Sequence, residues 1–139
     1  IDLTTRTLHI ANAGHPNPFL LKRADQTVLE LSDKGEAKGL ALGISNLSEY
    51  TTSTFDLSPQ DVLLLYTDGL YEVENDNGEY FDTGQLAEVI LHHVDDPVET
   101  LFNGVLNEIR SFGKSNHFED DVCLLAIEMR DTEAPAGRT

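Results

Sequence analysis

The segment Val62–Tyr66 constrains the fold most, because its five residues are all apolar and the chain then reaches Thr67, Asp68 and Gly69. Successive side chains of a strand point to opposite faces of the sheet, so an uninterrupted apolar run predicts a strand buried on both faces. Asp-Gly is a common turn sequence. We therefore expect a central strand that ends at a sharp turn carrying an acidic side chain.

Length and charge exclude several classes of protein. The 139 residues suffice for one domain with a single core. No apolar stretch approaches the ~20 residues that span a bilayer, so we expect no membrane segment. The net charge of -16 opposes binding to nucleic acid. It has two open interpretations, solubility or acids gathered to hold metal cations. The lone Cys123 suits a reducing compartment, and we expect a cytoplasmic protein.

Short apolar segments separated by turn sequences predict strands with short connections, which favour antiparallel pairing. These segments are Leu8–Ala13, Phe19–Lys22, Val28–Leu31, Thr51–Leu57 and Val62–Thr67. A further strand is expected at Val122–Ile127, near the end of the chain, and it is again all apolar. We expect this strand to be buried as well.

Two helices are expected between the last two strands. The first begins near Asp82 and has apolar residues at helical spacing. The second begins at Asp96-Pro97-Val98-Glu99, where the Asp serves as N-cap, the Pro takes the first position and the Glu completes a capping box. Gly113 ends it. A run of strands, two helices and one more strand is typical of an α+β fold, with helices packed on a largely antiparallel sheet.

Carboxylates stand at the ends of both apolar strands, Asp68 after the first and Asp120 and Asp121 before the second. If the two strands pair in antiparallel fashion, Asp68 and Asp120 meet at one end of the sheet. Clustered carboxylates repel each other unless a cation neutralises them, and Mg²⁺ accepts two or three such ligands beside several waters. Two other interpretations stay open: Asp-Gly as an ordinary turn, and 119–121 as a solvated loop.

The acidic segment 74–82 does not form an EF-hand. With Gly78 as the sixth loop residue, Val73 and Gly84 fall at the first and twelfth ligand positions, and neither can bind calcium through its side chain. Asn77-Gly78 predicts a tight turn instead. We interpret His15 as a turn residue, and His92 and His93 as surface and core-edge residues of a helix.

Four segments of the sequence, taken in their order along the chain, resemble the motifs of one protein family. They are ANAGHPNPFLL at 11–21, GLALGI at 39–44, DVLLLYTDGLYEVENDNGEYF at 61–81 and EDDVCLLAIE at 119–128. Together they resemble the metal-dependent protein phosphatase 2C superfamily, in the bacterial branch of stage II sporulation protein E and the stress-response sigma-factor regulators. The resemblance implies an α/β sandwich of antiparallel sheets flanked by helices. It also implies a phosphoserine/phosphothreonine phosphatase that uses Mn²⁺ or Mg²⁺.

The resemblance assigns roles to four residues. Asp68 and Asp120 correspond to two ligands of one metal in a two-metal site. Gly69 lets the chain turn beside the cation, and Asp121 occupies a polar position that is not generally a ligand. The implied substrate is a phosphorylated regulatory protein such as an anti-sigma-factor antagonist, with activity controlled by an N-terminal sensor or receiver domain.

One motif of the family is absent. The family's Gly-Asp pair followed by Gly-His-Gly supplies the acid that bridges both metals, and Gly14-His15-Pro16 does not replace it. We therefore expect 1–129 to be the carboxyl-terminal part of a catalytic domain, incomplete at its N-terminus, and 130–139 to be a flexible tail. Such a chain is expected to have little activity alone and to associate as a homodimer. The alternative is a non-catalytic protein-interaction module that keeps the fold.

Overall fold

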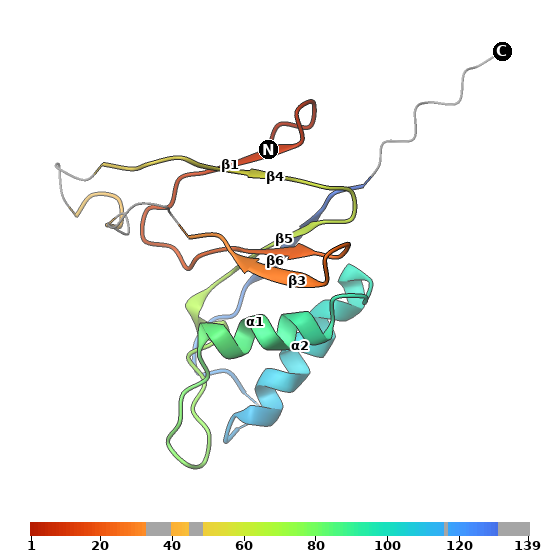
Figure 1. Ribbon diagram of the computed structural model, residues 1–139. Helices are drawn as coiled ribbons and strands as arrows, with labels where there is room; N and C mark the ends of the chain where they lie inside the picture. The colour runs from red at the N-terminus through yellow and green to blue at the C-terminus, as the bar shows by residue number, and fades with distance from the viewer. Residues whose placement is uncertain (33–39, 45–48, 116, 131–139) are drawn as a thin grey trace.

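The computed structural model describes residues 1–32, 40–44, 49–115 and 117–130. Strands precede the helices along the chain, and one strand follows them (Figure 1). The elements are β1 (Thr7–Ile10), β2 (Phe19–Lys22), β3 (Thr27–Glu30), β4 (Ser53–Asp56), β5 (Val62–Tyr66), the 3-10 helix η1 (Asp68–Leu70), α1 (Thr83–His92), α2 (Val98–Phe112) and β6 (Leu124–Glu128).

The strands form two antiparallel sheets, one with the order β3-β2-β5-β6 and one that pairs β1 with β4. Strand β5 lies between β2 and β6, with Phe19 opposite Leu64 and Tyr66 opposite Leu124. Its apolar run therefore has neighbours on both edges and both faces, as the sequence predicts.

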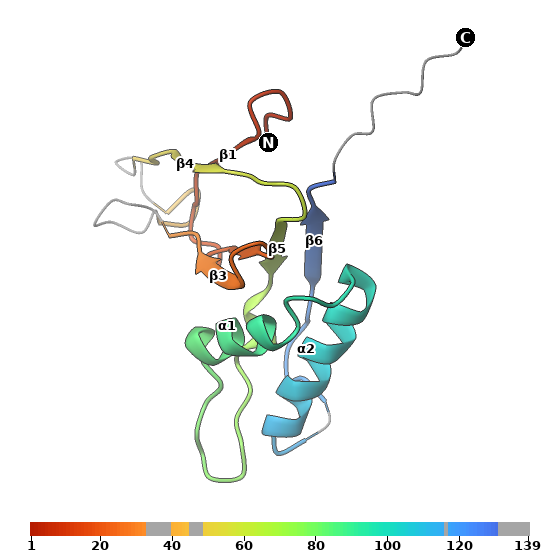
Figure 2. The same ribbon diagram turned by 45° about the vertical axis from the view of Figure 1, so that its right-hand side comes forward.

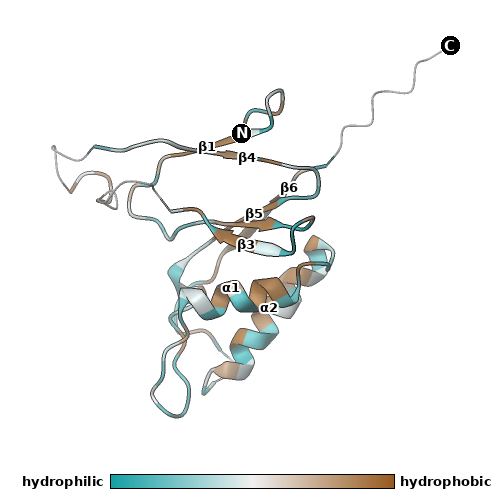
Figure 3. Ribbon diagram, in the orientation of Figure 1, coloured by the Kyte–Doolittle hydropathy of each residue, from teal (hydrophilic) through white to brown (hydrophobic). Residues whose placement is uncertain are grey.

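Two hydrophobic clusters fill the spaces between three layers (Figure 2). Between the four-stranded sheet and the helices, side chains of β5 such as Leu64 meet Leu86 of α1 and Leu101 of α2. On the opposite face of that sheet, Leu63 packs with Leu8 of β1 in a smaller cluster between the two sheets. Figure 3 shows the hydrophobic residues along these strands. The alternating side chains of β5 thus join both cores.

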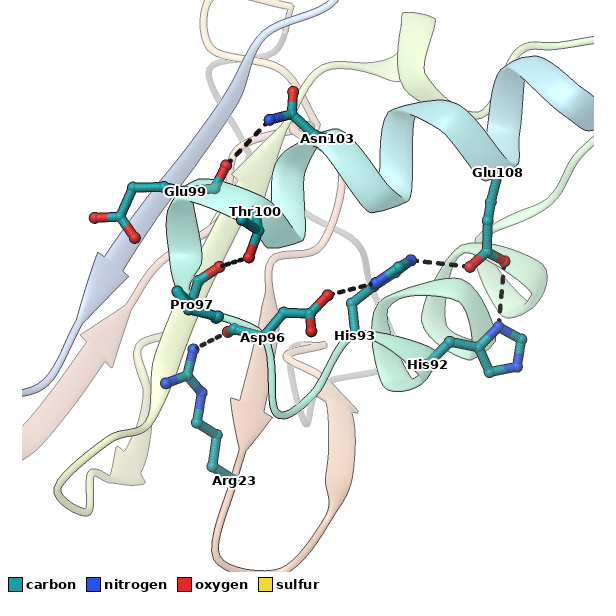
Figure 4. A network of polar contacts seen from close by, with 9 residues as sticks. All are labelled: Arg23, His92, His93, Asp96, Pro97, Glu99, Thr100, Asn103 and Glu108. Atoms are coloured by element: carbon teal, nitrogen blue, oxygen red, sulfur yellow. Dashed lines mark hydrogen bonds and ion pairs between the residues drawn. The ribbon is translucent and has the colours of Figure 1, made fainter.

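The turn between α1 and α2 differs from the sequence prediction. A capping box is present, but it begins α1, where Asp82 and Gln85 exchange side-chain and backbone hydrogen bonds. Helix α2 has Pro97 as N-cap without a side-chain cap. The carboxylate of Asp96 instead lies 2.8 Å from Nδ1 of His93 (Figure 4). The prediction of Asp96 as N-cap was wrong because a histidine three residues earlier competes for its carboxylate.

Histidine 93 lies between two carboxylates at this turn. Besides the contact with Asp96, its Nε2 lies 2.9 Å from Glu108 of α2, and the other oxygen of Glu108 lies 3.2 Å from Nδ1 of His92 (Figure 4). Arg23, directly after β2, donates to the carbonyl of Asp96 at 2.7 Å. The turn is therefore tied to both the sheet and α2, and His92 and His93 take the surface and core-edge positions that the sequence predicts.

Strand β6 is not buried on both faces. Its side chains alternate between half-buried and exposed, with Leu125 53% and Ile127 38% exposed. Only its neighbour β5 pairs with it in the described residues, so it is an edge strand. An all-apolar run alone does not reveal whether a second strand covers its other edge. The helices of the described residues also lie on one side only, against the four-stranded sheet, whereas the resemblance implied helices on both sides.

The other predicted elements are confirmed with small shifts of their ends. Asn77-Gly78 forms the expected turn, with Gly78 at a φ of +79°. The predicted turn sequence Asp33-Lys34-Gly35, the two ends Gly39 and Ser45 of the glycine-bearing connection 39–45, and the tail from 131 onward lie outside the described residues. Within the described ranges, no helix is long and apolar enough to cross a membrane.

Candidate metal centre

The pairing of β5 with β6 brings the predicted acids to one end of the sheet. The register runs from Val62 opposite Glu128 to Tyr66 opposite Leu124, and the backbone N–H of Thr67 continues it with a 3.1 Å bond to the carbonyl of Cys123. Asp68 comes directly after this ladder, and Asp120 lies three residues before its last member, Cys123. The predicted antiparallel pairing of the two strands is confirmed.

The position of Asp68 is fixed by its neighbours in η1. Leu70 is fully buried in the core under the helices, while Asp68 itself is exposed. The carbonyl of Asp68 accepts hydrogen bonds from the backbone N–H groups of Tyr71 and Glu72, at 2.9 and 3.1 Å. The short helix is therefore anchored by one apolar side chain and presents its first residue to solvent.

Gly69 is required by a close contact. A Cβ atom at this position would lie 2.8 Å from the carbonyl oxygen of Asp121 and 3.2 Å from the carbonyl carbon of Asp120. Its φ is not in the left-handed region. The interpretation that glycine is needed for an unusual turn is therefore replaced: a side chain here would force the two aspartate-bearing segments apart.

Within the described residues, the carboxylates of Asp68 and Asp120 each keep one oxygen without a hydrogen-bond partner. One oxygen of Asp68 accepts from the N–H of Gly69 at 3.2 Å, and one of Asp120 accepts from the N–H of Asp121 at 2.7 Å. Both residues are exposed. Over the part of the chain that the structure describes, neither carboxylate forms an ion pair. Hard divalent cations prefer such unpaired oxygens.

Negative charge at this end of the sheet acts on a neighbouring phenol. Burial raises the pKa of Tyr71, and the carboxylates of Asp68 and Glu72 raise it further. A phenolate would add a negative charge beside existing ones, so the neutral phenol is favoured. The ring of Tyr71 lies edge-on to Tyr66, with centroids 6.1 Å apart.

The donor set fits part of a metal centre. Two carboxylates with free oxygens suit Mg²⁺ or Mn²⁺, which retain water ligands. However, among the described residues no group of three His, Cys, Asp or Glu is arranged to hold a metal ion. His15 lies in an exposed bend, where its Nδ1 is 2.9 Å from the carbonyl of Pro16. This position agrees with its interpretation as a turn residue.

The arrangement of antiparallel sheets and helices matches phosphatase 2C-like domains. A solved structure of the RsbU and RsbW domains of Rv1364c from Mycobacterium tuberculosis has a TM-score of 0.75 and 30% identity, over 94% of this chain and 34% of that one. The phosphatase domain of SpoIIE from Bacillus subtilis has a TM-score of 0.69 and 17% identity, over 99% of this chain and 56% of that domain. The fold class is therefore confirmed.

The sequence comparison defines the family. The family described as Stage II sporulation protein E (SpoIIE) matches residues 1–130, so the chain belongs to this family. It is 27% identical over 120 residues to phosphoserine phosphatase RsbU of Bacillus subtilis, covering 86% of this chain, and 25% identical over 130 residues to phosphoserine phosphatase RsbP, covering 94%. The aligned part spans 34% and 29% of these relatives, about a third of their length. The resemblance inferred from the four segments is confirmed.

Sequence reasoning missed two polar residues that organise the strand ends. The hydroxyl of Thr67 bonds to the backbone on both sides of Val122. At the opposite end of β5, Asp61 is buried and pairs with Lys22 at 2.8 Å. The available signals were an acid, Asp61, directly before the apolar run of β5 and a lysine, Lys22, directly after the apolar residues of β2. Their partners depend on strand order, which the sequence does not show.

Proposed function

We propose that this chain forms part of a metal-dependent phosphatase that hydrolyses phosphoserine or phosphothreonine in a protein. The observation that carries the proposal is the β5–β6 register, which brings Asp68 and Asp120 to one end of the sheet with free carboxylate oxygens. The similarity to two phosphoserine phosphatases supports the reaction class.

In this proposal Asp68 and Asp120 hold one divalent cation, Mn²⁺ or Mg²⁺. A bound cation would supply the Lewis acidity that activates water and neutralises charge on a phosphate. The chain's own contribution is to hold two negative charges at a fixed place. Gly69 keeps the segments close together, while η1 presents Asp68 to solvent. The phosphatase domain of SpoIIE from Bacillus subtilis has been solved after soaking with Mn, which supports Mn²⁺ as the first cation to test.

The substrate and regulation extend the proposal. We propose a phosphorylated regulatory protein as substrate, with a sensor or receiver domain controlling activity, in the cytoplasm. Asp68 and Asp120 are both exposed, so another protein can reach them.

A non-catalytic interaction module is the second candidate. It is favoured by the finding that the described residues contain no group of three His, Cys, Asp or Glu side chains that could hold a metal ion. A two-metal site needs further ligands, so 1–139 alone should turn over little substrate.

The test is Mn²⁺-dependent release of phosphate from a phosphoserine protein, measured with the protein that carries this sequence and with the 139-residue chain alone. We expect the protein that carries this sequence to release phosphate, and EDTA to abolish this activity. We expect the 139-residue chain alone to hydrolyse little p-nitrophenyl phosphate. If the protein that carries this sequence shows no metal-dependent turnover, the interaction module is favoured. Full turnover by the 139-residue chain would contradict the view that two carboxylates form only part of the site.

A further inference from the structure

A threonine hydroxyl connects the two segments that carry the predicted metal ligands. Thr67 Oγ1 donates to the carbonyl of Asp121 at 2.9 Å and accepts from the backbone N–H of Cys123 at 2.9 Å. The backbone N–H of Thr67 also donates to the carbonyl of Cys123, at 3.1 Å. Three hydrogen bonds therefore join one residue at the end of β5 to the segment that leads into β6.

These bonds stand next to both acids. Asp68 directly follows Thr67, and Asp120 directly precedes Asp121. Two exposed carboxylates at one sheet end repel each other when no cation is bound, so the segments that carry them need to be held. The lack of a side chain on Gly69 lets the two segments approach closely, and the hydroxyl of Thr67 limits how far they can separate.

We propose that Thr67 is a positioning residue that sets the separation of the Asp68 and Asp120 carboxylates for a divalent cation. This inference rests on the proposed function, because it assumes that these carboxylates bind the cation. Residues that orient metal ligands through hydrogen bonds typically change metal affinity 10- to 100-fold when they are replaced.

The hydroxyl can be removed without removing the side chain's shape. Valine has the same branched outline as threonine but no hydroxyl, whereas serine keeps the hydroxyl and loses a methyl group. Asp121 and Cys123 are exposed, so water can replace the lost partner in Thr67→Val. The fold should therefore persist while the two segments gain freedom.

The experiment follows Mn²⁺-induced broadening of backbone amide signals in the 139-residue chain and its variants. In the unsubstituted chain, low Mn²⁺ should broaden the amides of 68–70 and 120–121 before those of other acidic loops such as 74–79. Thr67→Val should need about tenfold more Mn²⁺ for the same broadening, and Thr67→Ser should stay within about twofold of the unsubstituted chain, because it keeps the orienting hydroxyl.

Thr100→Val is the matched control. The Thr100 hydroxyl also donates to a backbone carbonyl, that of Pro97 at 3.0 Å, but at the start of α2 (Figure 4). It should leave Mn²⁺ broadening unchanged. Hydrogen exchange of the Cys123 amide should accelerate in Thr67→Val and not in Thr100→Val, which shows that the intended bond was lost. Thr67→Ala provides a second test of the same loss if the valine variant does not fold.

Two results would overturn the inference, and they differ. If Thr67→Val exposes the Cys123 amide but binds Mn²⁺ like the unsubstituted chain, the hydroxyl only completes the sheet, and the proposed function stands. If the unsubstituted chain shows no selective broadening at 68–70 and 120–121, the metal site itself is absent, and the proposed function fails together with the inference.

Discussion

The carbonyl oxygen of Asp121 lies 2.8 Å from the place where a Cβ atom on Gly69 would stand. The turn after β5 and the segment before β6 therefore approach so closely that no side chain fits between them. Because the neighbouring atoms belong to the backbone, a side chain at Gly69 cannot be accommodated by a rotamer change.

Gly69→Ala should therefore lower the free energy of unfolding by about 1–3 kcal/mol, as expected for overpacking against a fixed neighbour. Urea denaturation followed by circular dichroism measures it. Gly84→Ala, in the first turn of α1, is the control: its Cβ would approach only a side-chain oxygen of Asp82, at 3.2 Å, and alanine is favoured over glycine in a helix, so it should not destabilise the protein. Equal stability of Gly69→Ala and the unsubstituted chain would show that the two segments can move apart freely.

The effect of Gly104→Ala on the free energy of unfolding should depend on the residue at position 93. A Cβ atom on Gly104 would overlap the ring of His93, which is held by Asp96 and Glu108. Overpacking costs about 1–3 kcal/mol, more than the roughly 0.5–1 kcal/mol that alanine gains over glycine inside a helix. We expect Gly104→Ala to destabilise the protein, and to stabilise it when His93 is replaced by alanine. A double-mutant cycle by urea denaturation measures both values; stabilisation in both backgrounds would contradict the packing of His93 on α2.

The Tyr71 phenol should report the charge of Asp68. Burial, Asp68 and Glu72 raise the pKa of Tyr71 in the folded protein, so the unfolded chain ionises first. The resulting stability is fully present below about pH 10, the ordinary pKa of tyrosine, and is lost as the pH rises through the folded pKa. Asp68→Asn should lower the folded pKa of Tyr71 and make this loss smaller. Absorbance titration at alkaline pH, with Tyr71→Phe to assign the step, tests it; an unchanged titration would place Asp68 away from the phenol.

The exposed edge of β6 predicts self-association. Leu125 and Ile127 are exposed beside a mainly apolar cleft of about 460 Å³ between the sheets, and unpaired edges promote pairing between chains. Light scattering at moderate salt should show a dimer or larger species, and replacing both residues with lysine should yield a monomer. Leu91→Lys, at an exposed leucine of α1, should not. A monomer at high concentration of the unsubstituted chain would contradict this prediction.

The sequence revealed the central elements better than the contacts between them. Five apolar residues sufficed to predict β5. The antiparallel pairing of β5 with β6, which places Asp68 and Asp120 at the same end of the sheet, could also be predicted, because it follows from strand geometry. The edge position of β6 could not be predicted, since it depends on which strands lie beyond it. The wrong prediction of Asp96 as N-cap has a similar cause. The local sequence pattern favoured a helix start, but His93 competes for the Asp96 carboxylate, and Glu108 of α2 holds that histidine in place. Thr67 was missed because a hydroxyl acquires its partners only when β6 lies beside β5.

The most direct test of the account is the Mn²⁺ dependence of phosphatase activity in Asp68→Asn, Asp120→Asn and the double variant of the protein that carries this sequence. Each single change keeps the size of the side chain and removes its charge, so each should raise the Mn²⁺ concentration needed for half-maximal activity and lower the rate. The double variant should lose little more than the worse single variant, because residues that act as a unit are not additive. Glu119→Gln, at an exposed neighbouring acid, should be nearly silent. If Asp68→Asn keeps the normal Mn²⁺ dependence, the acid at the end of β5 is only a turn residue and the metal site is misassigned.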